Sequence, residues 1–564
     1  MRKFNVHLVF TLFSFGILIL GVNLTPLFDW DELNFAESAR EMNLTRNYLY
    51  SQIGFEPFWE KPPFFIWLQA LSERLFQSHQ PWVYKLPNIL AGVFAVNWVY
   101  HIGDRLGKRM LGGFWALATL FTLAPFIYWR SGIIDPIFNL FIVLSLYNWY
   151  KITQANLKEE RAHLYYLMVG VFLGFAFLTK GPVAIGITGL VVIWVTATRG
   201  KWHEILTWKL ILSLIGLCAV IGLWVFPLLQ SNGAPFLLEF IKYQIVLFKG
   251  QIEWHNQPWF YHFVVLFFLA FPASILALPH LFKNQVMDRN VDIWNLFMRA
   301  LFWVVLIVFS ITTTKIIHYS SLCWWPLTYF GAYQVYLIHT NRWHFPKWLI
   351  LPLTLSALGI VLVLWILPIT AHMDPLPEWI WNKLDVFTKG LLENRTSWSW
   401  TSLLPAALFT FWFFAWWILH LIGRRPHAGF LFLISGLVAL ISHITLLPPI
   451  GNLLQGKLTQ TIKNETKNGV FLEAWHFKTY SLYFHGEFTA KDFEQLKPEF
   501  PIEVNNPYPK QSARRSHAMN ANNTDLIKVI TKNTFTPDYE FDRKFTIDKK
   551  LGGYILWRKR SVQP

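Results

Sequence analysis

The feature that most constrains this chain is the recurrence of apolar segments of roughly 18 residues or more along most of its length. Clear segments begin at Val6, Trp82, Leu111, Leu164, Val183, Leu210, Phe260, Leu301, Trp348, Leu403 and Gly429, and weaker ones lie near 134–150 and 319–338. Each can cross a hydrocarbon core of about 30 Å. The sequence therefore predicts a polytopic α-helical membrane protein with about thirteen transmembrane helices.

The composition supports this class and excludes others. Only 15% of the residues are charged, whereas soluble domains carry about a quarter. The formal net charge of +16 does not indicate a nucleic-acid partner, because the basic residues are concentrated in short connections and in the tail. Cys218 and Cys323 both lie in apolar segments, so we expect them to be core residues rather than a disulfide framework.

The positions of the basic residues predict the topology. The N-terminus, "MRKFNVHLVFTLFSFGILILGVNL", has a basic start and an apolar core without an A-x-A-like cleavage site, so we interpret it as an uncleaved first span that starts in the cytoplasm. Stepping across each span then places the short basic connections inside, as the positive-inside rule requires. These connections contain Arg105, Lys108 and Arg109; Lys151, Lys158 and Arg161; Arg199 and Lys201; Lys283 and Arg289; Arg342 and Lys347; Arg424 and Arg425.

The same topology divides the chain into two domains. Residues 1–450 form the transmembrane domain, and residues 451–564, which are poorer in apolar runs, form a soluble extracytoplasmic mixed α/β domain with strands near 469–475 and 553–559. The first outer loop, 26–81, contains two short segments with helical periodicity, one around 33–42 and one after Pro62 and Pro63. Because both are amphipathic and too short to span, we expect them to lie along the outer membrane surface.

Polar motifs gather on the predicted outer face. They are "DWDELNFAESAREM" (29–42), "FWEKPPFFIW" (58–67), "RSGIIDPIF" (130–138), "TKGP" (179–182), "EWHNQPWFYH" (253–262) and "TKIIHY" (314–319). Asp135, Lys180 and Lys315 lie at the ends of spans, where ionisable residues are costly and tend to be functional. The sequence therefore predicts a site at the outer lipid boundary, suited to a substrate with a polar head and a lipid tail.

In this order, the motifs resemble one family. Asp31-Glu32, Glu60-Lys61-Pro62-Pro63, Asp135-Pro136, Leu178 to Pro182, His255 to Trp259 and Lys315 to Tyr319 are similar to elements of the lipid-linked-sugar glycosyltransferases with the C-type fold. This family comprises protein mannosyltransferases and the bacterial aminoarabinose transferase of lipid A. The tail stretch "AWHFKTYSLYFH" (474–485) is similar to part of the soluble domain of that transferase.

The resemblance implies an enzyme of the bacterial cytoplasmic (inner) membrane. It would move a sugar from a polyprenyl-phosphate donor to a lipid, glycan or protein acceptor on the outer face. No nucleotide sugar is expected and no cofactor is required; the sequence leaves a divalent metal open but does not indicate one.

Such a transfer needs a carboxylate for the acceptor's proton and cations for the leaving phosphate. The resemblance makes Asp31 the candidate base, with Glu32 and Asp135 as further catalytic carboxylates. Alternatively, Asp31 caps the helix that begins near Glu32, and Asp135 is a turn residue before Pro136.

Cations of the outer face are candidates for binding the donor phosphate. Lys61 is the first, with Glu60 fixing it, and the alternative is a surface ion pair between the two. Lys180 and Lys315 are further candidates, with snorkelling side chains at span ends as the alternative. His255, His318 and Tyr319 are candidate substrate-binding residues, although the two histidines can also serve as metal ligands or as hydrogen-bonding residues.

One position departs from the family pattern. The aminoarabinose transferases continue Asp-Glu-x with Arg-Tyr, where this chain has Asn34-Phe35. Arg130, on a neighbouring outer connection, is the candidate replacement for the missing phosphate-binding arginine. A different class, a transporter or flippase of lipid-linked sugars, is the alternative function, but transporters usually repeat their architecture and no such repeat is present.

The topology makes a direct prediction: the C-terminal domain lies outside the cytoplasm. A C-terminal alkaline phosphatase fusion should be active, and a C-terminal fluorescent protein that matures only in the cytosol should be dark. The opposite pair of results would contradict both the span number and the predicted side of the site.

Overall fold

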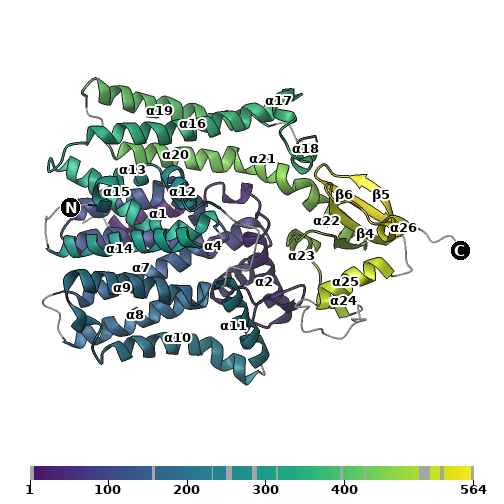
Figure 1. Cartoon of the computed structure of the whole chain (residues 1–564), viewed down its shortest axis with the longest axis horizontal. Helices are drawn as coiled ribbons and strands as arrows, with labels where there is room; N and C mark the ends of the chain where they lie inside the picture. The colour runs from purple at the N-terminus through teal and green to yellow at the C-terminus, as the bar shows by residue number, and fades with distance from the viewer. Residues whose placement is uncertain are drawn as a thin grey trace.

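The computed structural model describes residues 6–154, 159–231, 233–248, 257–282, 289–312, 315–393, 398–424, 427–494, 509–520 and 526–560. A bundle of long helices occupies most of the molecule, and a small sheet with short helices lies at one end of it (Figure 1). The longer helices of the bundle are α1 (Val6–Ile19), α4 (Pro81–Arg105), α5 (Arg109–Phe121), α7 (Asp135–Ile152), α8 (Glu159–Lys180), α9 (Val183–Arg199), α10 (Leu210–Gln230), α14 (Arg289–Ile311), α15 (Trp324–His339), α16 (Ile350–His372), α19 (Leu404–Leu421) and α20 (Phe430–Thr445).

Shorter elements connect these helices. They are η1 (Val22–Leu24), α6 (Leu123–Trp129), η2 (Trp202–Glu204), α11 (Ala234–Phe248), α12 (Tyr261–Leu269), α13 (Ala273–Phe282), η4 (Ile317–Cys323), η5 (Lys347–Leu349), α17 (Glu378–Trp381), α18 (Val386–Glu393) and η6 (Trp400–Leu403).

The apolar helices confirm the predicted class of polytopic membrane protein. Within the described residues, six helices are long and apolar enough to cross a membrane, or up to eight if each bent pair counts as one span. Helices α10 and α16 lie at the periphery of the bundle, and only 22% of the most apolar 18-residue segment of each is buried. In the central helix α14 the corresponding fraction is 61%. A bundle surrounded by lipid has this distribution. The figure of about thirteen spans stays a prediction.

Two helix pairs depart from straight spans. The segment predicted to begin at Leu111 bends by 69° between α5 and α6, and the segment beginning at Gly429 bends by 44° after α20. Beyond that second bend, residues 447–467 run through α21 (Leu447–Gly451), η7 (Asn452–Gly456) and α22 (Lys457–Lys467) as one helical stretch. The predicted domain boundary at 450 therefore falls inside a helix, and the division itself stays a prediction.

Helices α8 and α10 pack with their backbones in contact. A Cβ placed on Gly170 would lie 1.8 Å from the Ser213 carbonyl oxygen, and one on Gly216 would lie 2.5 Å from the Leu167 carbonyl oxygen. Only glycine permits this approach, as in other close helix pairs of membrane proteins. The contact fixes α8, whose last residue is Lys180.

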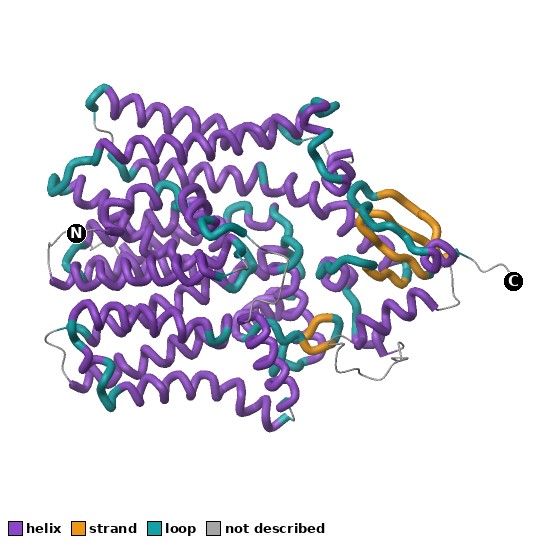
Figure 2. The backbone as a smooth tube through the Cα atoms, in the orientation of Figure 1, coloured by secondary structure: helices purple, strands orange, loops and turns teal. Residues whose placement is uncertain are grey.

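The C-terminal region contains the predicted mixed α/β fold. Its four-stranded sheet has the order β3-β4-β6-β5, with β3 parallel to β4 and the other pairs antiparallel. The strands are β3 (Phe471–Ala474), β4 (Ile527–Lys532), β5 (Phe545–Lys550) and β6 (Tyr554–Lys559), and the remaining helices are α23 (Ser481–Gly486), α24 (Ala490–Glu494), α25 (Pro509–Asn520) and α26 (Tyr539–Lys544). Apart from this sheet, the described strands are confined to one small hairpin, β1 (Gln52–Ile53) and β2 (Glu56–Pro57), in the first outer loop (Figure 2).

The first outer loop contains the two expected helices, α2 (Asp31–Thr45) and α3 (Phe64–Phe76), and α3 begins directly after the two prolines. The expectation that α2 rests on the membrane surface with an exposed polar face is wrong. Every residue from Glu32 to Met42 is buried, because α2 packs against α3 on one side and against α23 of the C-terminal region on another.

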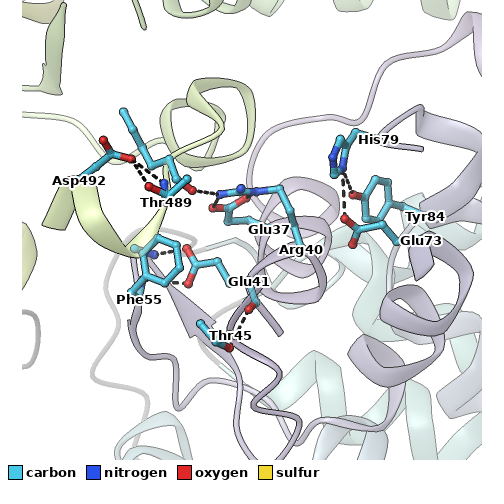
Figure 3. A network of polar contacts seen from close by, with 12 residues as sticks. Glu37, Arg40, Glu41, Thr45, Phe55, Glu73, His79, Tyr84, Thr489 and Asp492 are labelled. Carbon is cyan, nitrogen blue, oxygen red and sulfur yellow. Dashed lines mark hydrogen bonds and ion pairs between the residues drawn. The ribbon is translucent and has the colours of Figure 1, made fainter. Parts of the chain in front are cut away.

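Three buried charged residues of α2, Glu37, Arg40 and Glu41, are paired (Figure 3). Arg40 donates to both carboxylate oxygens of Glu37 at 2.7 Å and to the Phe488 carbonyl at 3.1 Å. Glu41 accepts from the backbone N–H groups of Gly54 at 2.6 Å and Phe55 at 2.8 Å. These bonds attach α2 to the β1–β2 hairpin and to the C-terminal region.

This arrangement predicts a pH dependence of stability. Burial, and secondly the nearby Glu37 carboxylate, raise the pKa of Glu41 well above 4.5. The folded protein thus holds this proton more tightly than the unfolded chain does, so the contribution of Glu41 to stability falls as pH rises from about 4.5 through the raised pKa. Glu41→Gln removes this titration. Its thermal midpoint, measured in detergent from about pH 5 to pH 8, should depend less on pH than that of the native protein. Parallel curves for the two proteins would contradict the prediction.

Candidate active site

Four side chains from four separate elements converge at the end of the bundle that the sequence predicts to face outward. His318, in η4, places Nε2 at 3.7 Å from an Asp31 carboxylate oxygen and at 4.0 Å from an Asp135 carboxylate oxygen. Asp135 in turn forms an ion pair with the Lys180 ammonium. The contacts from Asp31 through His318 and Asp135 to Lys180 therefore join four of the predicted outer motifs.

The two carboxylates occupy different environments. The Asp31 side chain is 43% exposed, and among the described residues its carboxylate contacts only His318. Asp135 is buried and paired with Lys180. Neither carboxylate caps its helix, because Trp30 and Ile134 occupy the N-cap positions of α2 and α7 and make no side-chain cap bond. The capping alternative for Asp31 is therefore wrong, and Asp31 can reach a substrate.

The electrostatics favour a neutral His318 at neutral pH. Burial lowers the pKa of its imidazole below 6.5, the carboxylates of Asp135 and Asp31 oppose the shift, and Lys180 and Lys61 add to it. A neutral imidazole has only one N–H, so at 3.7 Å and 4.0 Å the Nε2 atom lies near both carboxylates without forming a hydrogen bond to either.

Lys61 is close enough to this cluster to act electrostatically on His318. Within the described part of the chain, its ammonium makes no hydrogen bond or ion pair, and its side chain is partly exposed. Lys180, by contrast, is occupied by Asp135 and lies over the rings of Phe138 and Tyr319 at 5.6 Å and 5.3 Å. Lys61 is thus the cation of this cluster that is ready to accept an anion.

The expected pairing of Glu60 with Lys61 is wrong. Glu60 forms its ion pair with Lys478 of the C-terminal region, at 3.7 Å. The Lys478 ammonium also lies over the rings of Trp30 and Tyr480, at 5.5 Å and 5.0 Å. Sequence reasoning did not single out Lys478 as a site residue, although it lies within the stretch 474–485 that carries part of the family resemblance.

Glu32 has a structural role in place of the predicted catalytic one. It is buried, and its two carboxylate oxygens accept from the backbone N–H groups of Phe28 at 2.8 Å and Gly132 at 2.6 Å. The Gly132 bond holds the connection that leads into α7. Glu32 therefore joins the start of α2 to the start of α7, which carry Asp31 and Asp135.

Two predicted phosphate-binding cations are also engaged elsewhere. Arg130 is buried and donates to the carbonyls of Ile17 at 2.7 Å and Leu20 at 2.6 Å, which satisfies the C-terminal end of α1. Lys315 is buried and donates to the carbonyls of Gln257 and Thr312. Arg130 consequently does not replace the arginine missing at Asn34, and Lys315 stabilises its own connection.

The remaining predicted residues are placed as follows. Tyr319 lies beside His318, with ring centroids 5.3 Å apart, and under the Lys180 ammonium. His255 lies outside the described residues. Among those that are described, no group of three or more His, Cys, Asp or Glu side chains could hold a metal ion.

Comparisons with known proteins agree with this architecture. Residues 60–226 match the family described as dolichyl-phosphate-mannose-protein mannosyltransferase. Over the whole chain the fold resembles the crystal structure of ArnT from Cupriavidus metallidurans bound to undecaprenyl phosphate, with a TM-score of 0.71, 14% identity and 99% of each chain covered. The chain has the fold of ArnT. The expected fold class and the resemblance to the C-type lipid-linked-sugar glycosyltransferases are thereby confirmed.

Curated relatives carry one shared description, undecaprenyl phosphate-alpha-4-amino-4-deoxy-L-arabinose arabinosyl transferase. The protein of Wigglesworthia glossinidia brevipalpis is 22% identical over 339 residues, covering 58% of this chain and 57% of the relative. That of Shewanella sediminis is 24% identical over 345 residues, covering 60% and 61%. The matched segment thus spans about three fifths of the length of these relatives.

The Asp135–Lys180 ion pair predicts that a single substitution lowers the free energy of unfolding more than a double substitution does. Lys180→Met leaves an unpaired buried carboxylate and should lower the free energy of unfolding by about 3–5 kcal/mol, whereas adding Asp135→Asn should restore most of that loss. Denaturation in detergent measures both. Lys242→Met, which removes the lysine of the exposed pair with Glu239, is the matched control and should change stability little. An equally destabilised double variant would show that the two side chains do not depend on each other.

Proposed function

We propose that this chain is an integral-membrane glycosyltransferase that moves a sugar from a polyprenyl-phosphate donor to an acceptor on the outer face of the cytoplasmic membrane. The observation that carries the proposal is the convergence of Asp31, His318, Asp135 and Lys180 beside the accessible Lys61, at one end of a fold shared with a protein that binds undecaprenyl phosphate. The basic residues are concentrated in the connections predicted to face the cytoplasm, and this supports placing the site on the opposite, outer side of the membrane.

The reaction assigns one role to each part of the cluster. An acceptor hydroxyl attacks the anomeric carbon, the bond from that carbon to the phosphate oxygen breaks, and polyprenyl phosphate leaves with the electron pair. Asp31 takes the hydroxyl proton, because it is the exposed carboxylate. Lys61 binds the phosphate and stabilises its charge as it leaves.

Asp135 and Lys180 do not need to exchange protons with substrate in this scheme. Their ion pair, together with His318, fixes the electrostatic environment of Asp31. The proposed chemistry needs no cofactor, because the donor already carries a good leaving group. A chelator titration of the purified protein decides whether a divalent metal takes part.

The descriptions of the relatives restrict the range of candidate donors more than the range of candidate acceptors. Their description names undecaprenyl phosphate as carrier and an aminoarabinose as sugar. We propose the same class of carrier here and leave the sugar at the level of a pentose or hexose, because Asn34-Phe35 departs from the Arg-Tyr expected of the aminoarabinose-transferase pattern. The acceptor is proposed as a lipid, such as lipid A, a glycan or a protein.

Turnover by the purified protein tests the function. With a polyprenyl-phosphate sugar and candidate acceptors, the native protein should release free polyprenyl phosphate. Asp31→Asn keeps the shape but removes the base, so turnover should fall by about 10²-fold or more with little change in thermal stability. Near-native turnover of Asp31→Asn would exclude it as the base, and no release by the native protein with any donor would exclude the function.

Lys61 should contribute to binding of the donor phosphate. Lys61→Ala removes a charge-assisted hydrogen bond to phosphate worth about 1.5–3 kcal/mol, which corresponds to roughly a ten- to hundredfold loss in kcat/KM. The loss should appear in the dependence on donor concentration and leave the dependence on acceptor nearly unchanged. Lys478→Ala, which removes a neighbouring cation already paired with Glu60, is the comparison variant and should affect donor binding less. Equal affinity of native protein and Lys61→Ala for polyprenyl phosphate would overturn this assignment.

A further inference from the structure

The residue before the candidate base has a strained backbone. Trp30 has φ 78° and ψ −103°, a conformation that a residue with a side chain rarely adopts. Such a conformation persists only where the surrounding structure holds it. Because α2 begins at the next residue, Asp31, without a side-chain cap, the conformation of Trp30 sets the direction in which Asp31 enters the helix.

The groups that hold this conformation come from the C-terminal region. The Asp29 carboxylate oxygen Oδ1 accepts from the N–H of Trp30 at 2.8 Å and from the N–H of Tyr480 at 3.0 Å. Its other oxygen accepts from the Thr479 hydroxyl. The Asp29 N–H donates to the side-chain oxygen of Gln455 at 3.0 Å, and the Gln455 amide donates to the Leu27 carbonyl at 2.6 Å.

The Trp30 side chain is held from the same direction. It is 54% exposed, and the ring of Tyr480 meets it edge-on with centroids 5.9 Å apart. The Lys478 ammonium lies 5.5 Å from its centroid and is itself fixed by Glu60 at 3.7 Å. Residues 478–480 and Gln455 therefore hold both the backbone and the side chain of the segment that leads into Asp31.

We propose that Asp29 is a positioning residue through which the C-terminal region orients Asp31 toward the acceptor. Asp29 does not contact the reacting atoms in this role. Its Oδ1 atom accepts from both the Trp30 N–H and the Tyr480 N–H. A displacement of residues 479–480 would therefore move Trp30 and, with it, the adjacent Asp31. The inference rests on the proposed function, since it assumes that Asp31 is the base.

The test compares the kinetics of five purified full-length variants, Asp31→Asn among them, with those of the native protein. Asp29→Asn weakens the acceptor for Thr479 and Tyr480. Thr479→Val removes the hydroxyl hydrogen bond to Asp29, together with the one that this hydroxyl accepts from the Ser481 N–H at 3.2 Å. Thr466→Val is the matched control, because the Thr466 hydroxyl bonds only within α22, to the Ile462 carbonyl and more weakly to the Lys463 carbonyl. Asp29→Asn in an Asp31→Asn background completes a double-mutant cycle.

A misplaced base lowers the rate of the chemical step more than it weakens donor binding. Asp29→Asn should therefore reduce kcat by about ten- to a hundredfold with the donor KM within about twofold, Thr479→Val should reduce kcat by a smaller factor, and Thr466→Val should be unchanged. In the Asp31→Asn background, Asp29→Asn should cause little further loss, because there is no base left to orient.

Hydrogen exchange without substrate supplies a second measurement that does not depend on activity. Backbone amides in the segment 27–35 should exchange faster in Asp29→Asn and Thr479→Val than in the native protein and Thr466→Val. If Asp29→Asn does not fold, Thr479→Val alone and combined with Asp31→Asn provides the same comparison.

Each outcome decides a separate point. An inactive native protein would exclude the proposed function. Hydrogen exchange would then still show whether the contact of Asp29 with residues 479–480 stabilises the segment 27–35. Given an active native protein, the inference is overturned by full kcat in Asp29→Asn, by an equal loss in both backgrounds, or by unchanged exchange in the segment 27–35. The first two results would assign Asp29 a purely structural role.

Discussion

The structure depends on the burial of a polar helix. Four charged residues of α2, Glu32, Glu37, Arg40 and Glu41, are buried between the membrane bundle and the C-terminal region. Burying such groups is costly unless each is paired, and here each carboxylate or guanidinium has a partner on a different element or on the same helix. Removing the C-terminal region would therefore remove the Phe488 carbonyl that accepts from Arg40 and expose the buried charges of α2 to water, which would loosen the helix that begins at Asp31.

The candidate site lies where this buried helix meets the ends of three bundle elements. Asp31 comes from α2, Asp135 from α7, Lys180 from α8 and His318 from η4. Because each side chain is at or near an element terminus, its position is set by rigid helices rather than by long loops. The carboxylate of Asp31 is exposed and Lys61 is unengaged within the described residues, while Asp135 is buried and paired with Lys180.

The sequence predicted the class of protein, the mixed α/β fold of the C-terminal region and several of the side chains that converge at the candidate site, whose roles stay predictions. The lengths of the apolar segments, the positions of the basic residues and the order of the motifs can be recognised without a structure. From them, Asp31, Asp135, Lys180 and His318 were predicted to lie on the same side of the membrane. The partners of single side chains were not predictable in this way. Arg130 and Lys315 have the charge of a phosphate ligand, but backbone carbonyls from other elements take up their donors. Likewise, Glu60 is paired across 418 positions of sequence with Lys478 rather than with the adjacent Lys61.

The glycine contact between α8 and α10 has a consequence for the route of a lipid. Where Gly170 and Gly216 bring the two backbones together, no side chains separate the helices, and no gap is left that an isoprenoid chain could enter. A long acyl or prenyl tail whose head group binds near Lys180 therefore has to lie against another side of the bundle at this depth. Under the proposed function, the two glycines thus exclude the seam between α8 and α10 at this depth as a place where the lipid tail of the donor could insert.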